Sequence, residues 1–139
     1  MQARIFHFNS MVLLTKSMQS TLHAAIKFSR KCGGIVFFDV NLPLPLWSSR
    51  NETWRLIRQA WNFSNVIEVS KQELEFLLGE DYSEKRKKMS LQYSAHSDSE
   101  MKPQQHYSYT REELFSLWHD DIKVLIVNDG TNLYYYTNI

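Results

Sequence analysis

The sequence predicts an α/β fold, a largely parallel β-sheet with helices on both faces. Segments with strand character alternate with segments of helical periodicity, an order typical of right-handed crossovers between parallel strands. The strand-like runs "GIVFFD" (34–39) and "IKVLIVND" (122–129) are almost continuously apolar, which is typical of strands covered on both faces. With 139 residues, the chain is long enough for one domain with a hydrophobic core.

The first part of the chain gives a strand, a helix and a second strand. "RIFHFN" (4–9) has strand character. Residues 17–32 are predicted to be helical, because Leu22 and Ile26 recur at the spacing of one helix face. Gly33 supplies a C-terminal stop for this helix. The apolar run after Gly33 is the second strand.

A second helix is predicted over 49–61. Ser49 and Glu52 have the spacing of a capping box, in which a hydroxyl and a carboxylate satisfy the first backbone N–H groups. Trp54 and Trp61 lie on the same face of this helix. Both tryptophans are therefore predicted to be core residues.

The rest of the chain repeats the alternation. "NVIEVS" (65–70) is the third strand, and Ser70 with Glu73 forms a capping box for the helix that follows. The remaining predicted elements are a helix (110–119) capped by Thr110 and Glu113, a strand (122–129) and, after a turn at Asp129–Gly130, a last strand (132–139).

The segment 81–109 interrupts this pattern. It is polar, has few aliphatic residues and is far longer than an ordinary connection. We expect a mobile insertion on the surface. It contains the basic run "KRKK" (85–88), which could bind phosphate or an acidic partner, although a solvated charge run is the usual interpretation of such a stretch.

Composition and charge exclude several classes of protein. Hydrophobic residues make up 43% of the chain, which excludes a disordered protein. The net charge of +1 gives no indication of a nucleic-acid or membrane-surface partner, and no apolar run reaches transmembrane length. The single cysteine, Cys32, excludes an internal disulfide. His7, His23 and His119 lack the spacing of metal ligands.

Polar side chains follow the predicted strands where a ligand site is expected. In largely parallel sheets, ligands bind beyond the carboxyl ends of the strands. Asp39 and Asn41 follow the second strand, Ser70 the third, and Asn128 and Asp129 the fourth. A carboxylate at the end of a buried strand costs free energy unless it is paired, so Asp39 is the hardest of these residues to explain without a ligand.

These residues also have interpretations that need no ligand. The capping box alone explains Ser70 and Glu73. Asn41 can stabilise its own loop through its side chain. For Asp39 and Asn41, a remnant of a substrate site and a purely structural role are equally open.

Four motifs, in this order, carry a resemblance to a known family. They are "IFHFNS" (5–10), "DVNLPLPLW" (39–47), "IEVSKQELEFLLG" (67–79) and "IVNDGTNLYYY" (126–136). Together they resemble the pfkB-type (ribokinase-like) carbohydrate kinases, in particular the plant fructokinase branch, over nearly the whole chain apart from the polar insertion. The resemblance implies a ribokinase-like three-layer sandwich, present in residues 1–139 as a partial domain.

The resemblance also implies that this chain holds remnants of a kinase site, with a substrate side and a nucleotide and phosphate side. The implied residues are Asn9, Asp39 and Asn41 on the substrate side, and Ser70, Glu73, Asn128 and Gly130 on the nucleotide and phosphate side. The family's catalytic Gly-Ala-Gly-Asp segment lies further along than this chain extends. It supplies the aspartate base and an anion hole, so no catalytic residue and no metal ligand is expected within these residues.

The chain departs from the family pattern at phosphate-facing positions. Pro43 stands where the family has an arginine, which removes a cation that can bind phosphate. Glu68 replaces a lysine, and Asn128 replaces a threonine. Leu133 replaces a family glycine, so the backbone at this position can no longer approach a nucleotide closely. Asn9 replaces another family glycine.

These motifs and departures are most similar to the fructokinase-like proteins of plant chloroplasts. The resemblance implies a non-catalytic component of the plastid-encoded RNA polymerase and nucleoid complex, with protein partners, that supports plastid gene expression and chloroplast development. Neither enzymatic activity nor a cofactor is expected. The chloroplast location follows from the resemblance alone, because any transit peptide would precede Met1.

Two alternatives are open. The chain could be a fragment of an active ATP-dependent sugar (fructose) kinase, with ATP and magnesium as cofactors; Pro43 and Glu68 count against this. It could also be a sugar- or nucleotide-binding module without turnover. That alternative requires Asp39 and Asn41 to hold a ligand.

Overall fold

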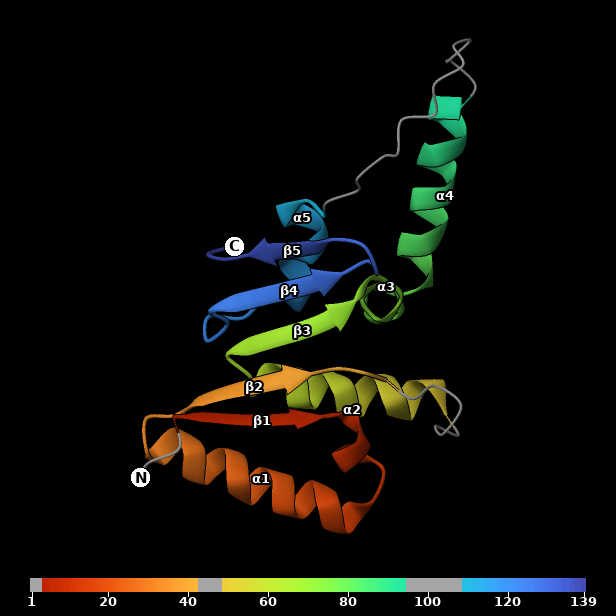
Figure 1. Ribbon diagram of the computed structural model, residues 1–139. Helices are drawn as coiled ribbons and strands as arrows, with labels where there is room; N and C mark the ends of the chain where they lie inside the picture. Colours follow the sequence, from red (N-terminus) through yellow and green to blue (C-terminus); the bar gives the residue numbers. More distant parts are fainter. Residues whose placement is uncertain (1–3, 43–48, 95–108) are drawn as a thin grey trace.

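The computed structural model of the protein describes residues 4–42, 49–94 and 109–139. Its centre is one five-stranded sheet in the order β1-β2-β3-β4-β5 (Figure 1). The first four strands are parallel, and β5 pairs antiparallel with β4. The prediction of a mostly parallel sheet is therefore confirmed. The strands are β1 (Ile5–Asn9), β2 (Ile35–Asp39), β3 (Val66–Ser70), β4 (Val124–Asn128) and β5 (Leu133–Tyr136).

Helices connect the parallel strands, as the alternation in the sequence predicts. None of the helices in the described ranges has the length and apolar character that a membrane span requires. The helical elements are η1 (Ser10–Leu13), α1 (Lys16–Lys31), α2 (Arg50–Asn62), α3 (Lys71–Leu78), α4 (Glu80–Ser94), α5 (Arg111–Leu114) and η3 (Phe115–Leu117).

Short polar side chains fix where four of the helices begin. Each accepts a hydrogen bond from the backbone N–H three residues later, which satisfies a donor that the helix leaves free. The predicted capping boxes at α3 and α5 are complete, because the side chains of Glu73 and Glu113 accept a hydrogen bond from the backbone N–H of the cap residue. At α2 the structure shows the hydrogen bond to the Ser49 side chain but not the one to Glu52. The four cap residues are Thr15, Ser49, Ser70 and Thr110.

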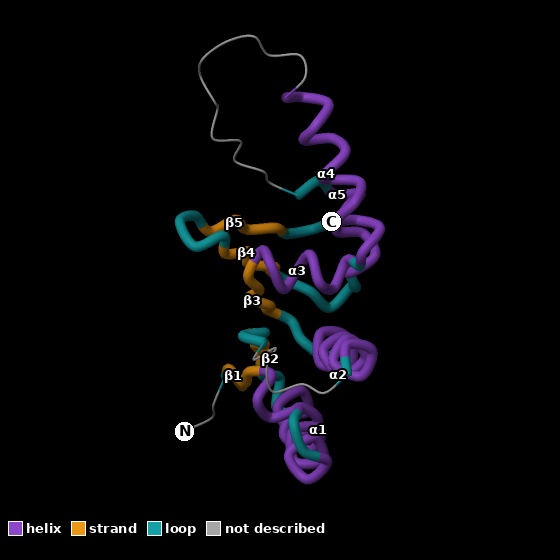
Figure 2. Tube along the Cα trace, turned by 90° about the vertical axis from the view of Figure 1, so that its right-hand side faces the viewer, coloured by secondary structure: helices purple, strands orange, loops and turns teal. Residues whose placement is uncertain are grey.

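The described helices lie on one face of the sheet. Figure 2 shows α1, α2 and α3 on the same side of the strands. The second helical layer that the sequence predicts is not found among the described residues. Accordingly, the opposite face of the sheet is partly open: Ile5 is 59% exposed and Tyr135 is 64% exposed.

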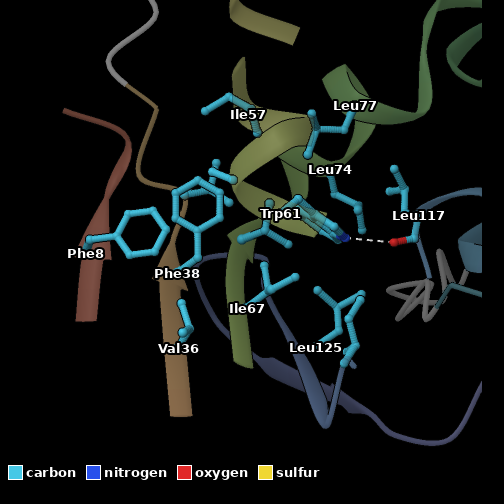
Figure 3. Close-up of a cluster of buried hydrophobic side chains, with 14 of the residues drawn as sticks. Phe8, Val36, Phe38, Ile57, Trp61, Ile67, Leu74, Leu77, Leu117 and Leu125 are labelled. Carbon is cyan, nitrogen blue, oxygen red and sulfur yellow. Dashed lines mark hydrogen bonds between the residues drawn. The ribbon is translucent and has the colours of Figure 1, made fainter. Parts of the chain in front are cut away.

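The core lies between the sheet and the helices (Figure 3). Phe38 and Trp61 are fully buried in it, and the ring of Phe8 stacks on that of Phe38 with 4.7 Å between centroids. The indole Nε1 of Trp61 donates a hydrogen bond to the carbonyl of Leu117 at 2.7 Å. Trp61 therefore joins α2 to η3 through both packing and a hydrogen bond.

Two predictions about the core elements are wrong. The helix predicted over 110–119 is only the single turn α5, followed by the 3-10 turn η3. The helical path ends at Trp118, whose backbone is extended (φ −80°, ψ 142°). Trp54 is 43% exposed rather than buried. It lies at the edge of α2, where its Nε1 donates to the Leu77 carbonyl at 3.1 Å.

The polar segment 81–109 begins with a helix that the sequence pattern does not predict. α4 starts directly after Gly79, whose φ of 95° is accessible to glycine at little cost. Acidic residues occupy its first turn, where they favour the positive end of the helix dipole. Residues 95–108 lie outside the described residues, and the mobility of the segment stays a prediction.

Candidate functional site

The carboxyl ends of the parallel strands bring the predicted site residues together as neighbours. Asn9 lies opposite Asp39 in the register of β1 and β2. Asp39 in turn lies opposite Glu68 on β3. Ser70 and Asn128 are opposite each other at the ends of β3 and β4. The predicted substrate-side and phosphate-side residues therefore share one edge of the sheet.

Asn9 and Asn41 take part in backbone contacts at this edge. The Asn9 side chain accepts a hydrogen bond from the Met11 N–H at 3.0 Å and so caps η1. The buried Ser10 hydroxyl donates to the Asn41 carbonyl at 2.9 Å, which fastens the loop after β2 to the end of β1. Asn41 has a φ of 32°, and asparagine tolerates positive φ better than most residues. The capping bond explains Asn9 without a ligand, whereas the contact of Asn41 is made by its backbone and only its positive φ favours an asparagine there.

Glu73 binds two backbone segments at once. One carboxylate oxygen accepts the Ser70 N–H at 2.8 Å, and the Glu73 N–H donates to the Ser70 hydroxyl at 3.2 Å. The other carboxylate oxygen accepts the Leu42 N–H at 2.5 Å. Glu73 therefore starts α3 and also ties the loop after β2 to that start. The capping box predicted for Ser70 and Glu73 is present.

Asp39 is a partly buried carboxylate whose charged form the fold disfavours. Burial raises the pKa of Asp39 above its ordinary value; the nearby His7 opposes this shift and the Glu73 carboxylate adds to it. Within the described part of the chain, no hydrogen bond to the Asp39 carboxylate is found. This is the pattern of a residue retained at some cost to stability.

Replacing Asp39 with asparagine is expected to raise stability at neutral pH. A carboxyl with a raised folded-state pKa favours folding only while it is protonated, so its contribution is lost as pH rises through that pKa. Urea unfolding at pH 7 is expected to show a higher midpoint for Asp39→Asn, and the difference should shrink below about pH 4. A lower midpoint for Asp39→Asn at pH 7 would mean that the native carboxylate is favourably paired.

In the turn between β4 and β5, the predicted phosphate-side residues form hydrogen bonds within the turn itself. Gly130 has a φ of 93°, which glycine adopts readily, and its N–H donates to the Asn128 side chain at 2.8 Å. Asp129 accepts hydrogen bonds from the N–H groups of Thr131 at 3.0 Å and Asn132 at 2.7 Å. The predicted turn is confirmed, and its polar side chains hold its own backbone.

The hydrogen bonds to the Asp129 carboxylate predict that this group titrates at a lower pH than an ordinary aspartate. Hydrogen bonds from the backbone N–H groups of Asn132 and Thr131 lower the pKa of Asp129 to about 2. Because the folded-state pKa is depressed, the bonds stabilise the turn above about pH 4 and are lost as pH falls toward 2. An NMR titration of the Asn132 amide is expected to show a midpoint near 2, absent in Asp129→Asn. A midpoint near 4 would contradict the hydrogen-bonding pattern.

The departures from the family pattern have visible consequences at this edge. Glu68 stands beside Asp39 on adjacent strands, and like charges in such pairs are unfavourable. Leu133, which replaces a family glycine, is 49% exposed and lies opposite Asn128. Pro43 lies outside the described residues.

One cluster of polar and aromatic residues was missed by the sequence analysis. Arg86 of α4 lies over the rings of Tyr109 at 4.5 Å and Tyr82 at 5.6 Å, and its Nη1 is 3.4 Å from a Glu75 carboxylate oxygen. The Tyr82 hydroxyl donates to Glu113 at 3.0 Å, and the Tyr109 hydroxyl donates to Glu75 at 3.4 Å. We call these five residues the Arg86 cluster.

The Arg86 cluster anchors α4 to the edge of the fold. Burial raises the pKa values of Tyr82 and Tyr109, so both phenols stay protonated and act as hydrogen-bond donors. The Tyr109 N–H also donates to the Tyr136 hydroxyl at 2.8 Å, which reaches β5. The signal in the sequence was a tyrosine near each end of the otherwise polar segment 81–109.

The remaining reactive side chains have ordinary surroundings. His7 and His23 pack against phenylalanine rings, and the His119 ring forms a hydrogen bond with the Trp61 carbonyl at 2.9 Å. Cys32 is exposed. In the described ranges, no three His, Cys, Asp or Glu side chains lie close enough to hold a metal ion.

Comparison with known proteins finds relatives in plants. No family model matches the chain. It is 59% identical to fructokinase-like 1, chloroplastic, and 41% identical to fructokinase-like 2, chloroplastic, both from Arabidopsis thaliana, in each case over 98% of the chain. It is 31% identical to the probable fructokinase-7 of the same plant. The chain spans 29%, 21% and 33% of the length of these three relatives.

The fold is shared with solved bacterial kinases. The structure of fructokinase with bound ATP from Xylella fastidiosa matches 98% of the chain with a TM-score of 0.68 and 18% identity, and the chain covers 36% of it. Fructokinase from Vibrio cholerae O395 matches with a TM-score of 0.63, 24% identity and similar coverage. At this level of identity the likeness concerns the fold, which is ribokinase-like over the part that the chain covers.

Proposed function

Because this chain is a relative of plant fructokinases and fructokinase-like proteins and carries part of their ribokinase-like fold, we propose that it is a non-catalytic component of the plastid-encoded RNA polymerase and nucleoid complex. In this role it supports plastid gene expression and chloroplast development through protein contacts. The two fructokinase-like relatives are named chloroplastic, and a chloroplast location follows from that resemblance.

The observation that carries the proposal is the set of hydrogen bonds that the Glu73 carboxylate accepts. Both of its carboxylate oxygens accept backbone N–H groups, one from Ser70 and one from Leu42. Organising a metal or a phosphate with this carboxylate would require breaking a bond that holds the local fold. The same holds for Asn128, whose side chain is bonded to the Gly130 N–H. The residues on the phosphate side thus serve the fold.

The charge at the substrate edge also supports the absence of phosphoryl transfer. Asp39 and Glu68 place two carboxylates on adjacent strands. Phosphoryl transfer develops negative charge on the transferred group, and kinases stabilise that charge with cations. Two neighbouring carboxylates act in the opposite sense.

The alternative of an active sugar kinase has one observation in its favour. Asp39 is retained although burial disfavours its charge, and active sites often keep such costly groups. This alternative needs ATP and magnesium. The described phosphate-side residues fit them poorly, because Glu73 and Asn128 already bind backbone.

The polymerase role is tested with the tagged full-length gene product in chloroplasts. We expect it to copurify with subunits of the plastid-encoded RNA polymerase, and its depletion to lower transcripts made by that enzyme several-fold. A double variant, Asp39→Asn with Asn41→Gly, changes two of the three substrate-side residues and suits the positive φ of residue 41. It should restore transcription fully. Failure to copurify, or failure of this variant to restore transcription, would contradict the proposal.

A further inference from the structure

The net charge of +1 hides an uneven distribution of charge along the chain. Residues 1–62 carry eight lysine or arginine side chains and two acidic ones, whereas residues 63–139 carry eight and thirteen. The net charge is therefore +6 in the first part and −5 in the second. Figure 1 shows β1, α1, β2 and α2 at one end of the molecule and the later helices and strands beyond them. One end of the protein is thus basic.

Helix α1 holds half of the cations of this basic part. Its sequence, KSMQSTLHAAIKFSRK, contains four lysine or arginine residues and no acidic one. The buried residues Leu22 and Ile26 mark the side that packs on the sheet. On a helix with 3.6 residues per turn, Lys16, Lys27 and Lys31 fall within an arc of about 60° outside that side. All three lysines are exposed.

Within the described ranges, these three lysines form no ion pair. The carboxylate of Asp121 pairs with Arg30 instead, at 3.6 Å. Asp39 alternates with the buried Phe38 along β2 and so lies on the face of the sheet opposite α1. The neighbouring helix α2 carries Glu52, but it also carries three arginines. The surface around α1 therefore keeps a net positive charge.

An exposed aromatic ring borders the lysines of α1. Phe28 is 70% exposed and lies outside the hydrophobic core cluster. It is about 60° from Lys31 around the helix axis. The neighbouring Ser20 and Ala24 are small and exposed, so they do not screen the ring or the ammonium groups. We define the outer face of α1 as Lys16, Lys27, Phe28 and Lys31.

We propose that the outer face of α1 binds a single-stranded nucleic acid, with the three lysines on its phosphates and Phe28 stacked on a base. Proteins that bind single strands combine a positive surface along the backbone with aromatic rings on which bases stack. Lysines that neutralise phosphates gain affinity because the strand releases its counterions. The outer face of α1 offers both the unpaired cations and the free ring.

Other partners fit the outer face of α1 less well. Lysine is depleted in protein–protein interfaces, and this face has a single large apolar side chain to fill a partner's pocket. A helix that lies on a membrane needs a broad apolar side, but Leu22 and Ile26 of α1 are buried in the core. A free ring also favours a single strand over a duplex, because the bases of a duplex are already stacked on one another.

This inference goes beyond the proposed polymerase role and does not rest on it. A protein can join a complex through protein contacts without touching nucleic acid. Binding at α1 is measured on the purified protein, whereas the polymerase role is tested by copurification from chloroplasts. Either result can therefore fail while the other holds.

The test is fluorescence anisotropy of the purified full-length protein with a labelled oligothymidylate. We expect saturable binding, with a slope of about −2 when the logarithm of the association constant is plotted against that of the salt concentration, the value for three phosphate contacts on a single strand. K16Q/K27Q/K31Q is expected to weaken binding about tenfold or more, and Phe28→Ala about fivefold or more. These side chains are exposed and their replacements are good helix formers, so the variants should fold, which circular dichroism verifies.

A matched variant on α4 separates local from general effects of charge. K85Q/K87Q/K88Q removes three exposed lysines at the opposite end of the molecule (Figures 1 and 2). It is expected to leave binding of the oligonucleotide within about twofold. The inference is overturned if both triple variants weaken binding equally, if Phe28→Ala has no effect, if a polyglutamate peptide or a phosphatidylglycerol vesicle binds more tightly than the oligonucleotide, or if the oligonucleotide does not bind.

Discussion

Replacing Trp61 with alanine is expected to lower the free energy of unfolding by about 3–5 kcal/mol, because truncating a fully buried tryptophan removes apolar contact and leaves a cavity. Trp61 is 0% exposed at the centre of the core. Its Nε1 bond to the Leu117 carbonyl, 2.7 Å long, would also be lost, which leaves that acceptor without its partner. Urea unfolding followed by circular dichroism measures the change.

Trp54 is the matched control, since it lies on the same helix and is 43% exposed. Trp54→Ala is expected to cost markedly less than Trp61→Ala. Trp61→Phe keeps most of the packing but removes the donor, and should fall between the two. Equal losses for Trp54→Ala and Trp61→Ala would contradict the arrangement of α2 on the sheet.

Replacing Glu73 with alanine is expected to lower the free energy of unfolding by about 2–4 kcal/mol. The change removes half of the capping box of α3 and the bond to the Leu42 N–H together. Such a loss would identify Glu73 as a structural residue at the edge where a ligand was predicted. The same urea unfolding measurement applies.

Two variants make the Glu73 result specific. Glu73→Gln keeps an acceptor of similar shape and is expected to lose about half as much stability or less. Glu52→Ala changes the corresponding position of α2, where the structure shows only the serine half of the box, and should cost less than Glu73→Ala. A Glu73→Ala protein as stable as the wild type would leave its carboxylate available for another role.

The strands were predictable because their signal is local and strong. The runs ending at Asp39, Ser70 and Asn128 are apolar, are bounded by turn or cap residues, and lie within one or two residues of the predicted bounds. The order of strands and helices then gave the parallel pairing. The last strand was predicted from the turn at Asp129 and Gly130, and the structure adds that it pairs antiparallel with β4.

Which residues of a helix are buried was less predictable than where the helix lies in the chain. Periodicity placed Trp54 and Trp61 on one face, but the sheet covers only part of that face. Trp61 reaches the core, while Trp54 ends at the α2–α3 boundary. The second helical layer was inferred from apolar strands, although their open faces show only partial burial.

The location of the candidate site was predictable, but the hydrogen bonds of its residues were not. The architecture alone put Asp39, Ser70 and Asn128 at one edge of the sheet. That Glu73 reaches back to Leu42 depends on a contact between residues 31 positions apart, which no local pattern contains. The Arg86 cluster was missed for a similar reason, because it joins residues of α3 and α4 to Tyr109 and Glu113 further along the chain.

Calorimetric titration of the full-length gene product with fructose and with ATP-magnesium, together with a phosphoryl-transfer assay, tests the central claim most directly. A plant fructokinase run in parallel shows that the assay works. The non-catalytic role predicts no turnover and no saturable heat for either compound, with Asp39 and Asn41 as remnants of an older site. Saturable binding with turnover would contradict it and make Glu68 a tolerated change in a working kinase.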